Sequence, residues 1–246
     1  MPPKLESSAT TTARALLRTI IPPRISKPIV LTKRLLVDTG YMRSFRRGSR
    51  IVDADNSPIP WFTYPSIAYL NSLDLRSARV LEFGSGSSTL FWERRCGSVV
   101  SVEHDADWHA ALKRELRSST RYILATDEES YVTPVDPEAR FDVIAVDGAF
   151  RRRCIDTALK QRADGGIIVL DNSDWFPDLA HTLRSSGLIQ VDFTGFVALL
   201  SFPSITSVWL DGRNPPIHTE GGPLLPRGAP DFWLNMANAD PGFPRF

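Results

Sequence analysis

Short apolar runs alternate with segments of helical spacing along the chain from residue 78 to residue 210. This alternation predicts an α/β fold, because each apolar run forms a buried strand and each helix crosses back over the sheet. We therefore expect a doubly wound, mostly parallel, seven-stranded sheet with helices on both faces. The strands are expected at residues 78–84, 98–105, 121–126, 141–148 and 165–172, followed by an antiparallel pair at 188–195 and 205–212.

Helices are expected between these strands, and the flanking regions have a different character. The expected helices cover residues 66–75, 87–96, 106–119, 151–163 and 176–187, the fourth ended by the glycines at 165–166 and the last by Gly187. Helical spacing at 13–21 is interrupted by the three prolines of 21–28 and resumes at 29–45. We predict a basic extension at 1–57, partly helical or disordered, a catalytic domain at 58–212 and an irregular Pro/Gly-rich tail at 213–246.

Positive charge gathers at the N-terminus, although the whole chain has a formal net charge of only +1. Residues 1–50 contain eleven Lys and Arg against two acidic residues, Glu6 and Asp38. Such an arm can contact RNA, an anionic membrane surface or another subunit, as in a homodimer, or it can be a solvated tail. DNA is not an expected partner. The sequence does not distinguish among these four roles of the basic segment.

Only two cysteines occur, Cys96 and Cys154, and no Cys-x-x-Cys pair is present. This usage disfavours a zinc site and a disulfide framework, and it favours a reducing compartment. No apolar run approaches the roughly 20 residues of a membrane-spanning helix, and no secretory signal is visible. We therefore expect a cytoplasmic protein.

The stretch VLEFGSGSSTLFW, residues 80–92, has the pattern of a cofactor-binding turn. Glycines after a strand let the main chain approach a ligand, and the N-terminus of the next helix offers free N–H groups. Glu103 ends the following strand, about 20 residues later, where an acidic residue can bind the hydroxyls of a ribose. The sequence does not match the dinucleotide pattern G-x-G-x-x-G. Gly84 and Gly86 fit its first two glycines, but Thr89 occupies the position of the third.

This stretch resembles motif I of class I S-adenosylmethionine-dependent methyltransferases, in which an acidic residue precedes glycines at the second and fourth following positions. The segments SVEHD, RFDVIAVDGAF and ADGGIIVLDN resemble later motifs of that family, so the likeness extends over residues 78–210. Ser88 stands where the family usually has another glycine. The resemblance implies a Rossmann-like methyltransferase fold and cofactor contacts from eight residues: Glu82, Gly84, Ser85, Gly86, Ser88, Glu103, Thr63 and Tyr64. In that family a segment before the first strand often closes over the methionine end of the cofactor, and Trp61, Thr63 and Tyr64 of PWFTYP could do so here, with an aromatic face toward the sulfonium.

Acidic and amide residues end the fourth and fifth expected strands. Asp147, Asp171 and Asn172 are similar in placement to the metal ligands of catechol-type and caffeoyl-CoA-type O-methyltransferases. That resemblance implies a Mg²⁺ site, with oxygen ligands that suit a hard cation, and catalytic roles for Asp147 and Asp171. The expected reaction is O-methylation of a small molecule, with nitrogen as the alternative acceptor atom. Asp174 and His181 are further candidate bases, and Arg151–Arg153 could hold an anionic substrate.

Two alternatives belong to other classes of function. One is a non-catalytic binding module with a methyltransferase fold, in which the basic arm mediates assembly. The other is an NAD-dependent oxidoreductase, which the missing third glycine disfavours. Chemistry on a flipped base is also disfavoured, because VDGA stands after the fourth strand in place of an Asn-Pro-Pro-Tyr type of motif.

Overall fold

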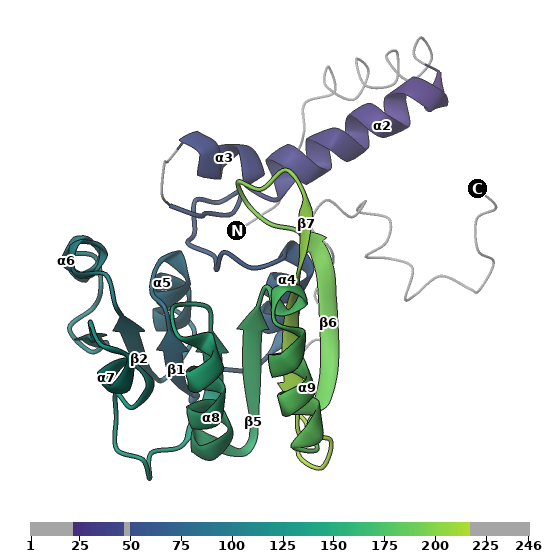
Figure 1. Ribbon diagram of the computed structural model, residues 1–246. Helices are drawn as coiled ribbons and strands as arrows, with labels where there is room; N and C mark the ends of the chain where they lie inside the picture. The colour runs from purple at the N-terminus through teal and green to yellow at the C-terminus, as the bar shows by residue number, and fades with distance from the viewer. Residues whose placement is uncertain (1–21, 47–49, 217–246) are drawn as a thin grey trace.

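The central element of the protein is a seven-stranded sheet in the order β3-β2-β1-β4-β5-β7-β6, shown in Figure 1. A computed structural model describes residues 22–46 and 50–216. Strands β1 to β5 are parallel, and β7 runs antiparallel to both β5 and β6. The strands are β1 (Arg79–Phe83), β2 (Ser98–Glu103), β3 (Arg121–Leu124), β4 (Phe141–Val146), β5 (Arg162–Asp171), β6 (Ile189–Phe196) and β7 (Pro203–Leu210). The predicted α/β, mostly parallel fold is confirmed.

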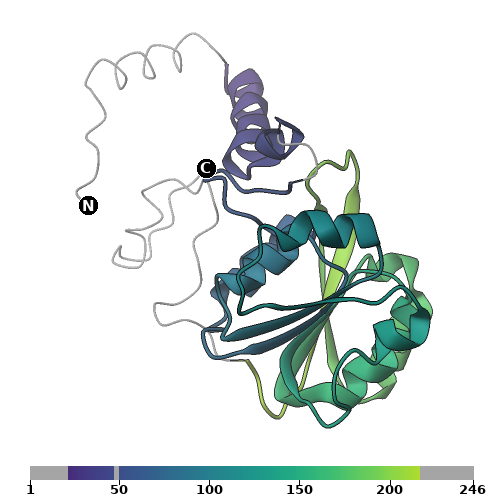
Figure 2. The same ribbon diagram turned by 90° about the vertical axis from the view of Figure 1, so that its left-hand side faces the viewer.

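Helices cover both faces of the sheet, as Figure 2 shows. One face packs against α4 (Tyr64–Ser72) and α5 (Ser87–Glu93), through a core that includes Phe62, Leu70 and Trp92. The other face packs against α7 (Glu128–Val132), α8 (Arg151–Gln161) and α9 (Pro177–Ser185), through Phe83, Ile155 and Leu183. Helix α6 (Ala106–Lys113) contacts β2 and β3, and a short 3₁₀ turn, η2 (Ser173–Trp175), follows β5.

Strand order fixes where a ligand can bind. The chain leaves β1 toward β2 and later returns to the opposite side of β1 to form β4. The connections therefore diverge between β1 and β4, which leaves a crevice at the carboxyl ends of these two strands. Glu103, Asp147, Asp171 and Asn172, which the sequence placed at the ends of strands two, four and five, meet at this edge.

Three local expectations differ from the structure. The prolines at 21–28 do not interrupt the helix that follows, because α2 (Pro23–Lys33) begins at Pro23 and continues through Pro28. Proline costs little in the first turn of a helix, where its missing N–H has no partner. Strand β5 begins at Arg162, before the glycines at 165–166. Helix α7 was not expected; the Asp127 carboxylate caps it by accepting the Ser130 N–H.

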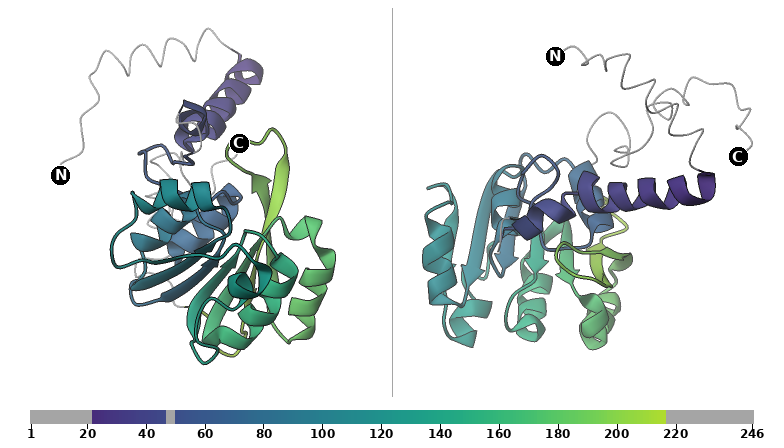
Figure 3. Two further views of the ribbon diagram at one scale, coloured as in Figure 1. Left: turned by 60° about the vertical axis from the view of Figure 1, so that its left-hand side comes forward. Right: turned by 90° about the horizontal axis from the view of Figure 1, so that it is seen from above.

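The N-terminal segment continues from α2 through a π-helical turn, η1 (Arg34–Asp38), into α3 (Tyr41–Arg46). It extends over the carboxyl edge of the sheet and away from the body (Figure 3). The helix expected at 13–21 and the tail from residue 217 lie outside the described residues. Within the described ranges, no helix is both long and apolar enough to span a bilayer. The domain boundaries at residues 57 and 212 stay a prediction.

Candidate functional site

A cavity of about 870 Å³ opens at the carboxyl edge of the sheet, over the divergence of β1 and β4. The turn after β1 and the ends of β2, β4 and β5 supply its polar wall. The loop between β6 and β7 supplies half of an apolar wall, which Ile51, Trp61, Trp108 and Trp175 complete. The polar lining comprises Gly84, Ser85, Gly86, Ser87, Ser88, Glu103, His104, Asp147, Gly148, Arg151, Asp171 and Asn172. This lining contains Glu103 and six further residues that the sequence predicted to bind the cofactor or to act in catalysis: Gly84, Ser85, Gly86, Ser88, Asp147 and Asp171.

Two glycines form the floor of this cavity. Gly84 has a φ of +96°, and a Cβ built on it would lie 2.7 Å from the Cα of Gly148. A Cβ on Gly148 would in turn lie 2.6 Å from the Cα of Gly84. The main chains that leave β1 and β4 are therefore in direct contact, and no side chain fits between them. This contact exposes bare backbone to the cavity.

Glu103 ends β2 with its carboxylate directed at the glycine turn. One carboxylate oxygen, Oε2, accepts hydrogen bonds from the Ser85 hydroxyl at 2.6 Å and the Ser85 N–H at 3.2 Å. The other, Oε1, accepts the N–H groups of His104 and Asp105 at 2.8 and 2.9 Å. The Ser85 contact shows that Oε2 accepts a hydrogen bond from a hydroxyl group at the cavity wall. Glu103 thus has the position that the sequence predicted for a ribose-binding residue.

Glu82 does not face the cavity, which corrects its predicted contact with the cofactor. It is 1% exposed, and its carboxylate accepts hydrogen bonds from the hydroxyls of Thr89 at 2.6 Å and Ser101 at 2.8 Å. The Trp92 indole N–H donates to the other oxygen at 3.1 Å. Thr89 also accepts the Gly86 N–H at 3.0 Å. Glu82 therefore stabilises the turn from beneath by connecting α5 to β1 and β2.

The ionisation of Glu82 should make the stability of the protein depend on pH. Burial raises the pKa of Glu82 from 4.5 to about 7. A carboxyl group with a raised pKa binds its proton more tightly in the folded chain, so its contribution is complete below the unfolded pKa and is lost as pH rises through the folded one. We expect the free energy of unfolding to fall between about pH 5 and about pH 8, by up to roughly 1.4 kcal/mol per pH unit for each such group.

Urea unfolding at a series of pH values measures this effect, and Glu82→Gln should make the dependence shallower. The exposed carboxylate of Glu138, 86% accessible, gives a matched control in Glu138→Gln, which should leave the profile unchanged. A Glu82→Gln profile as steep as that of the unsubstituted protein would contradict the assignment.

The residues predicted to bind Mg²⁺ surround a guanidinium group instead. Arg151, on α8, donates to the Asp147 carboxylate at 3.0 Å and to the Asn172 side-chain oxygen at 3.3 Å. It also donates to the main-chain carbonyls of Asp147, Gly148 and Asp171. Among the described residues, no group of three His, Cys, Asp or Glu side chains could hold a metal ion. A guanidinium cation thus neutralises the site, and Asp147, Asp171 and Asn172 do not form the predicted Mg²⁺ site.

Asp147 and Asp171 both line the cavity, and Asp171 is the more deeply buried of the two. It is 3% exposed, and its Oδ1 accepts a short hydrogen bond from the Thr206 hydroxyl. Burial, reinforced by the nearby charge of Asp147, raises the pKa of Asp171 well above its usual range. Burial also raises the pKa of Asp147, against the opposing effect of Arg151. A carboxyl group with a raised pKa is a stronger base once it has ionised.

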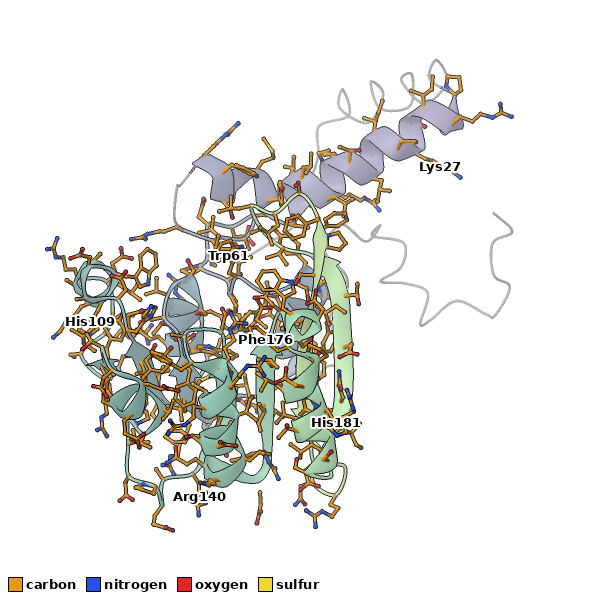
Figure 4. The ribbon with its side chains drawn as sticks, viewed as in Figure 1. Lys27, Trp61, His109, Arg140, Phe176 and His181 are labelled. Atoms are coloured by element: carbon orange, nitrogen blue, oxygen red, sulfur yellow. The ribbon has the colours of Figure 1, made fainter. Side chains whose placement is uncertain are left out.

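Of the three residues of PWFTYP that the sequence placed near the cofactor, only Trp61 lines the cavity. Thr63 is fully buried and donates its hydroxyl to the Phe193 carbonyl at 2.9 Å, while Tyr64 packs against the core. Neither lines the cavity, and the hydrogen bonds of Thr63 hold the segment against β6 and β7. Trp61 lines it, and its indole N–H donates to the Ala198 carbonyl at 2.7 Å (Figure 4).

Apart from Trp61, the apolar wall was not predicted from the sequence. It comprises Ile51, Trp61, Trp108, Trp175, Val197, Leu199, Leu200 and Phe202. The signal available was the run FVALLSF, residues 196–202, because a connection between two strands is usually polar. The other candidate bases are not in the lining: Asp174 accepts the Ile205 N–H at 3.3 Å, and His181 lies along α9 away from the cavity (Figure 4).

Comparison with known proteins gives partial structural similarities and no match of sequence. No family model matches the chain, and no curated protein sequence matches it. A precorrin-6y C5,15-methyltransferase from Geobacter metallireducens is 14% identical with a TM-score of 0.47, over 60% of this chain and 87% of that chain. The N-methyltransferase NodS from Bradyrhizobium japonicum, in complex with S-adenosylhomocysteine, is 16% identical with a TM-score of 0.41, over 55% and 79%. A tRNA methyltransferase from Aquifex aeolicus is 16% identical with a TM-score of 0.46, over 61% and 70%.

Proposed function

We propose that the protein is an S-adenosylmethionine-dependent methyltransferase that acts on an oxygen or nitrogen atom of a small-molecule acceptor. The observation that carries this proposal is the Glu103 carboxylate, which lies against the glycine turn at the wall of the cavity and accepts a hydrogen bond from the Ser85 hydroxyl. A carboxylate at the end of the second strand and bare main chain at the end of the first are what an adenosine cofactor needs.

The polar residues of the cavity fit the parts of this cofactor. Glu103 can accept the ribose hydroxyls, and the main chain of residues 84–88 can approach the ligand closely because Gly84 and Gly86 carry no side chains. The sulfonium and ammonium groups of the cofactor are positive, and the indole of Trp61 or Trp108 offers a face to a cation. When bound, the cofactor supplies an electrophilic methyl group.

Asp171 is the base that the geometry supports best. Its carboxylate lies against the cavity, its pKa is raised by burial, and Thr206 fixes one of its oxygens. In the proposed reaction, Asp171 accepts the proton of the attacking hydroxyl or amine, while Arg151 holds the ends of β4 and β5 in place. The apolar wall excludes water and positions the acceptor. This positioning supplies much of the rate enhancement through proximity.

The proposal is tested by titration calorimetry with S-adenosylhomocysteine. The unsubstituted protein should bind this ligand, and Glu103→Ala should weaken the affinity by about 1–3 kcal/mol, or roughly 5- to 150-fold, the range for a lost hydrogen bond to a charged group. Glu128, 46% exposed on α7 and outside the cavity lining, gives the control Glu128→Ala, whose affinity should be unchanged. Equal affinity for Glu103→Ala and the unsubstituted protein would refute the ribose assignment.

Turnover separates the proposed enzyme from a binding module. Radiolabelled S-adenosylmethionine should transfer its methyl group to at least one member of a panel of phenols, alcohols and amines. Tight binding without transfer to any acceptor favours a non-catalytic module with the same fold. Binding of NAD in preference to S-adenosylhomocysteine would overturn the proposal and favour an oxidoreductase.

A further inference from the structure

The segment of residues 22–46, here called the N-terminal arm, projects from the carboxyl edge of the sheet as α2, η1 and α3 (Figures 1 and 3). Neither the core of the sheet nor the proposed reaction uses α2. Figure 4 shows Lys27 on this helix, at the opposite end of the molecule from Arg140. The role of the arm is therefore separate from the packing of the sheet and from the proposed reaction.

The surface of the arm is both apolar and cationic. It carries six basic residues, Arg24, Lys27, Lys33, Arg34, Arg43 and Arg46, and a single acidic residue. That acidic residue, Asp38, lies 3.9 Å from the Lys33 ammonium group. Eight large apolar side chains of the arm are 41–58% exposed: Ile25, Ile29, Val30, Leu31, Leu35, Val37, Met42 and Phe45. Exposed apolar surface of this extent marks an interaction site.

The base of the arm is built into the wall of the cavity. The Tyr41 hydroxyl donates to the Leu200 carbonyl at 2.8 Å, in the loop between β6 and β7. The fully buried Ser44 hydroxyl donates to the Val52 carbonyl and accepts the Val52 N–H, each at 3.1 Å, and Ile51 beside it lines the cavity. The arm and the cavity therefore have a fixed relation to each other.

Exposed apolar side chains continue from the arm to the cavity. Among the described residues, sixteen large apolar side chains are exposed, and twelve of these belong to the arm or to the cavity lining. The four in the lining are Trp61, Trp108, Trp175 and Phe202, between 37% and 59% exposed. Tryptophan is enriched where a protein meets the interface between lipid and water. The arm thus adds an apolar and cationic surface to a cavity whose exposed side chains are themselves apolar.

We propose that the N-terminal arm docks on the surface of an anionic phospholipid bilayer and holds the cavity toward that surface. A helix at a bilayer interface places its apolar side chains among the acyl chains while Lys and Arg extend to the headgroups. The excess of cations complements anionic lipid, which attracts basic residues near the surface. The proposed contact is interfacial, with α2 at the boundary between headgroups and acyl chains.

The distribution of apolar residues favours a bilayer over a groove on a second protein. A groove covers one face of a helix, with anchors three or four residues apart. Ile29 and Leu31 are two residues apart, so they point to different sides of α2, and they are 57% and 58% exposed. A groove of fixed shape covers only one of these sides, whereas a helix that enters the interfacial region at a tilt can place both side chains among lipid.

This orientation has a consequence for the acceptor, which rests on the proposed methyl transfer. An acceptor that resides in the membrane would enter the cavity past the apolar wall without crossing bulk water. The acceptor class indicated is an amphiphile with a hydroxyl or amino headgroup. The docking itself does not depend on this consequence.

The test is flotation of the full chain with phosphatidylcholine vesicles that either contain or lack phosphatidylglycerol. The chain should float only with the anionic vesicles. Lys27→Gln combined with Arg34→Gln should lower the partition coefficient about 30-fold, as expected for two lost charges. Ile29→Gln combined with Leu31→Gln should lower it at least tenfold. Glutamine keeps the helix propensity high.

Matched controls lie elsewhere on the molecule, in Arg140→Gln, a basic residue 44% exposed, and Ile189→Gln, an apolar residue 53% exposed. Both should float like the unsubstituted protein. The proposal is overturned if the chain ignores anionic vesicles, or if the two arm variants bind them undiminished. It is also overturned if sedimentation shows a dimer that Ile29→Gln with Leu31→Gln dissociates, because the arm then contacts a second copy. Titration with S-adenosylhomocysteine on the same samples reports the proposed function separately.

Discussion

Gly84→Ala should destabilise the protein by about 2–6 kcal/mol and abolish binding of S-adenosylhomocysteine. The φ of +96° at Gly84 is unfavourable for alanine, at a cost of about 1–3 kcal/mol. The added methyl group would also lie 2.7 Å from the main chain of Gly148, and relieving such a clash by backbone movement costs about 1–3 kcal/mol more. This movement separates the ends of β1 and β4, between which the cavity forms. Chemical unfolding and calorimetry measure the two effects.

Two other glycines separate the causes. Gly187 has a φ of +87° with no heavy atom within 4 Å of a built Cβ, so Gly187→Ala reports the cost of the backbone conformation alone, about 1–2 kcal/mol. Gly86 has extended backbone, and its built Cβ lies 3.9 Å from the Trp108 ring, so Gly86→Ala should fold normally. If Gly84→Ala is no less stable than Gly187→Ala, the contact between Gly84 and Gly148 does not support the site.

The fold could be predicted because its strands are buried on both faces. Uninterrupted apolar runs such as residues 141–146 are produced by burial in a parallel sheet, and the turns between them carry glycine and aspartate. The short helix α7 lacks an apolar periodicity of sufficient length, so its capping residue Asp127 was the only local signal. The sequence wrongly predicted an interruption at Pro28, because proline inside a helix is unfavourable on average. Pro28 nevertheless lies within α2, which is exposed.

The candidate site could be predicted in outline only. Strand ends fixed the places of Glu103, Asp147 and Asp171, because position along a parallel strand determines which edge a residue occupies. Whether a carboxylate at that edge faces a cavity depends on which other side chains donate hydrogen bonds to it. Glu82 faces inward because Thr89, Ser101 and Trp92 donate to it, and these side chains come from two other elements, α5 and β2. The same limit applies to Arg151, which was read as a possible anion binder and instead occupies the predicted metal site.

Arg151→Met should lower the stability of the protein by about 3–5 kcal/mol, the usual cost of removing one partner of a buried ion pair. The Arg151 side chain is 14% exposed and the Asp147 side chain 22% exposed, so the carboxylate would lose its neutralising charge in a poorly solvated place. The carbonyls of Asp147, Gly148 and Asp171 would lose donors as well. For a domain of this size, thermal unfolding should shift by roughly 6–20 °C.

The adjacent arginine provides the matched control for this prediction. Arg152 is 64% exposed and pairs with Asp178, 50% exposed, so Arg152→Met should cost no more than about 1 kcal/mol. Adding Asp147→Asn to Arg151→Met should restore part of the loss, because the uncompensated carboxylate is then gone. The destabilisation by Arg151→Met should also shrink as pH falls, since protonated Asp147 needs no cation. Equal losses for the two arginines, or no recovery in the double variant, would mean that Arg151 does not neutralise the edge of the sheet where the proposed reaction takes place.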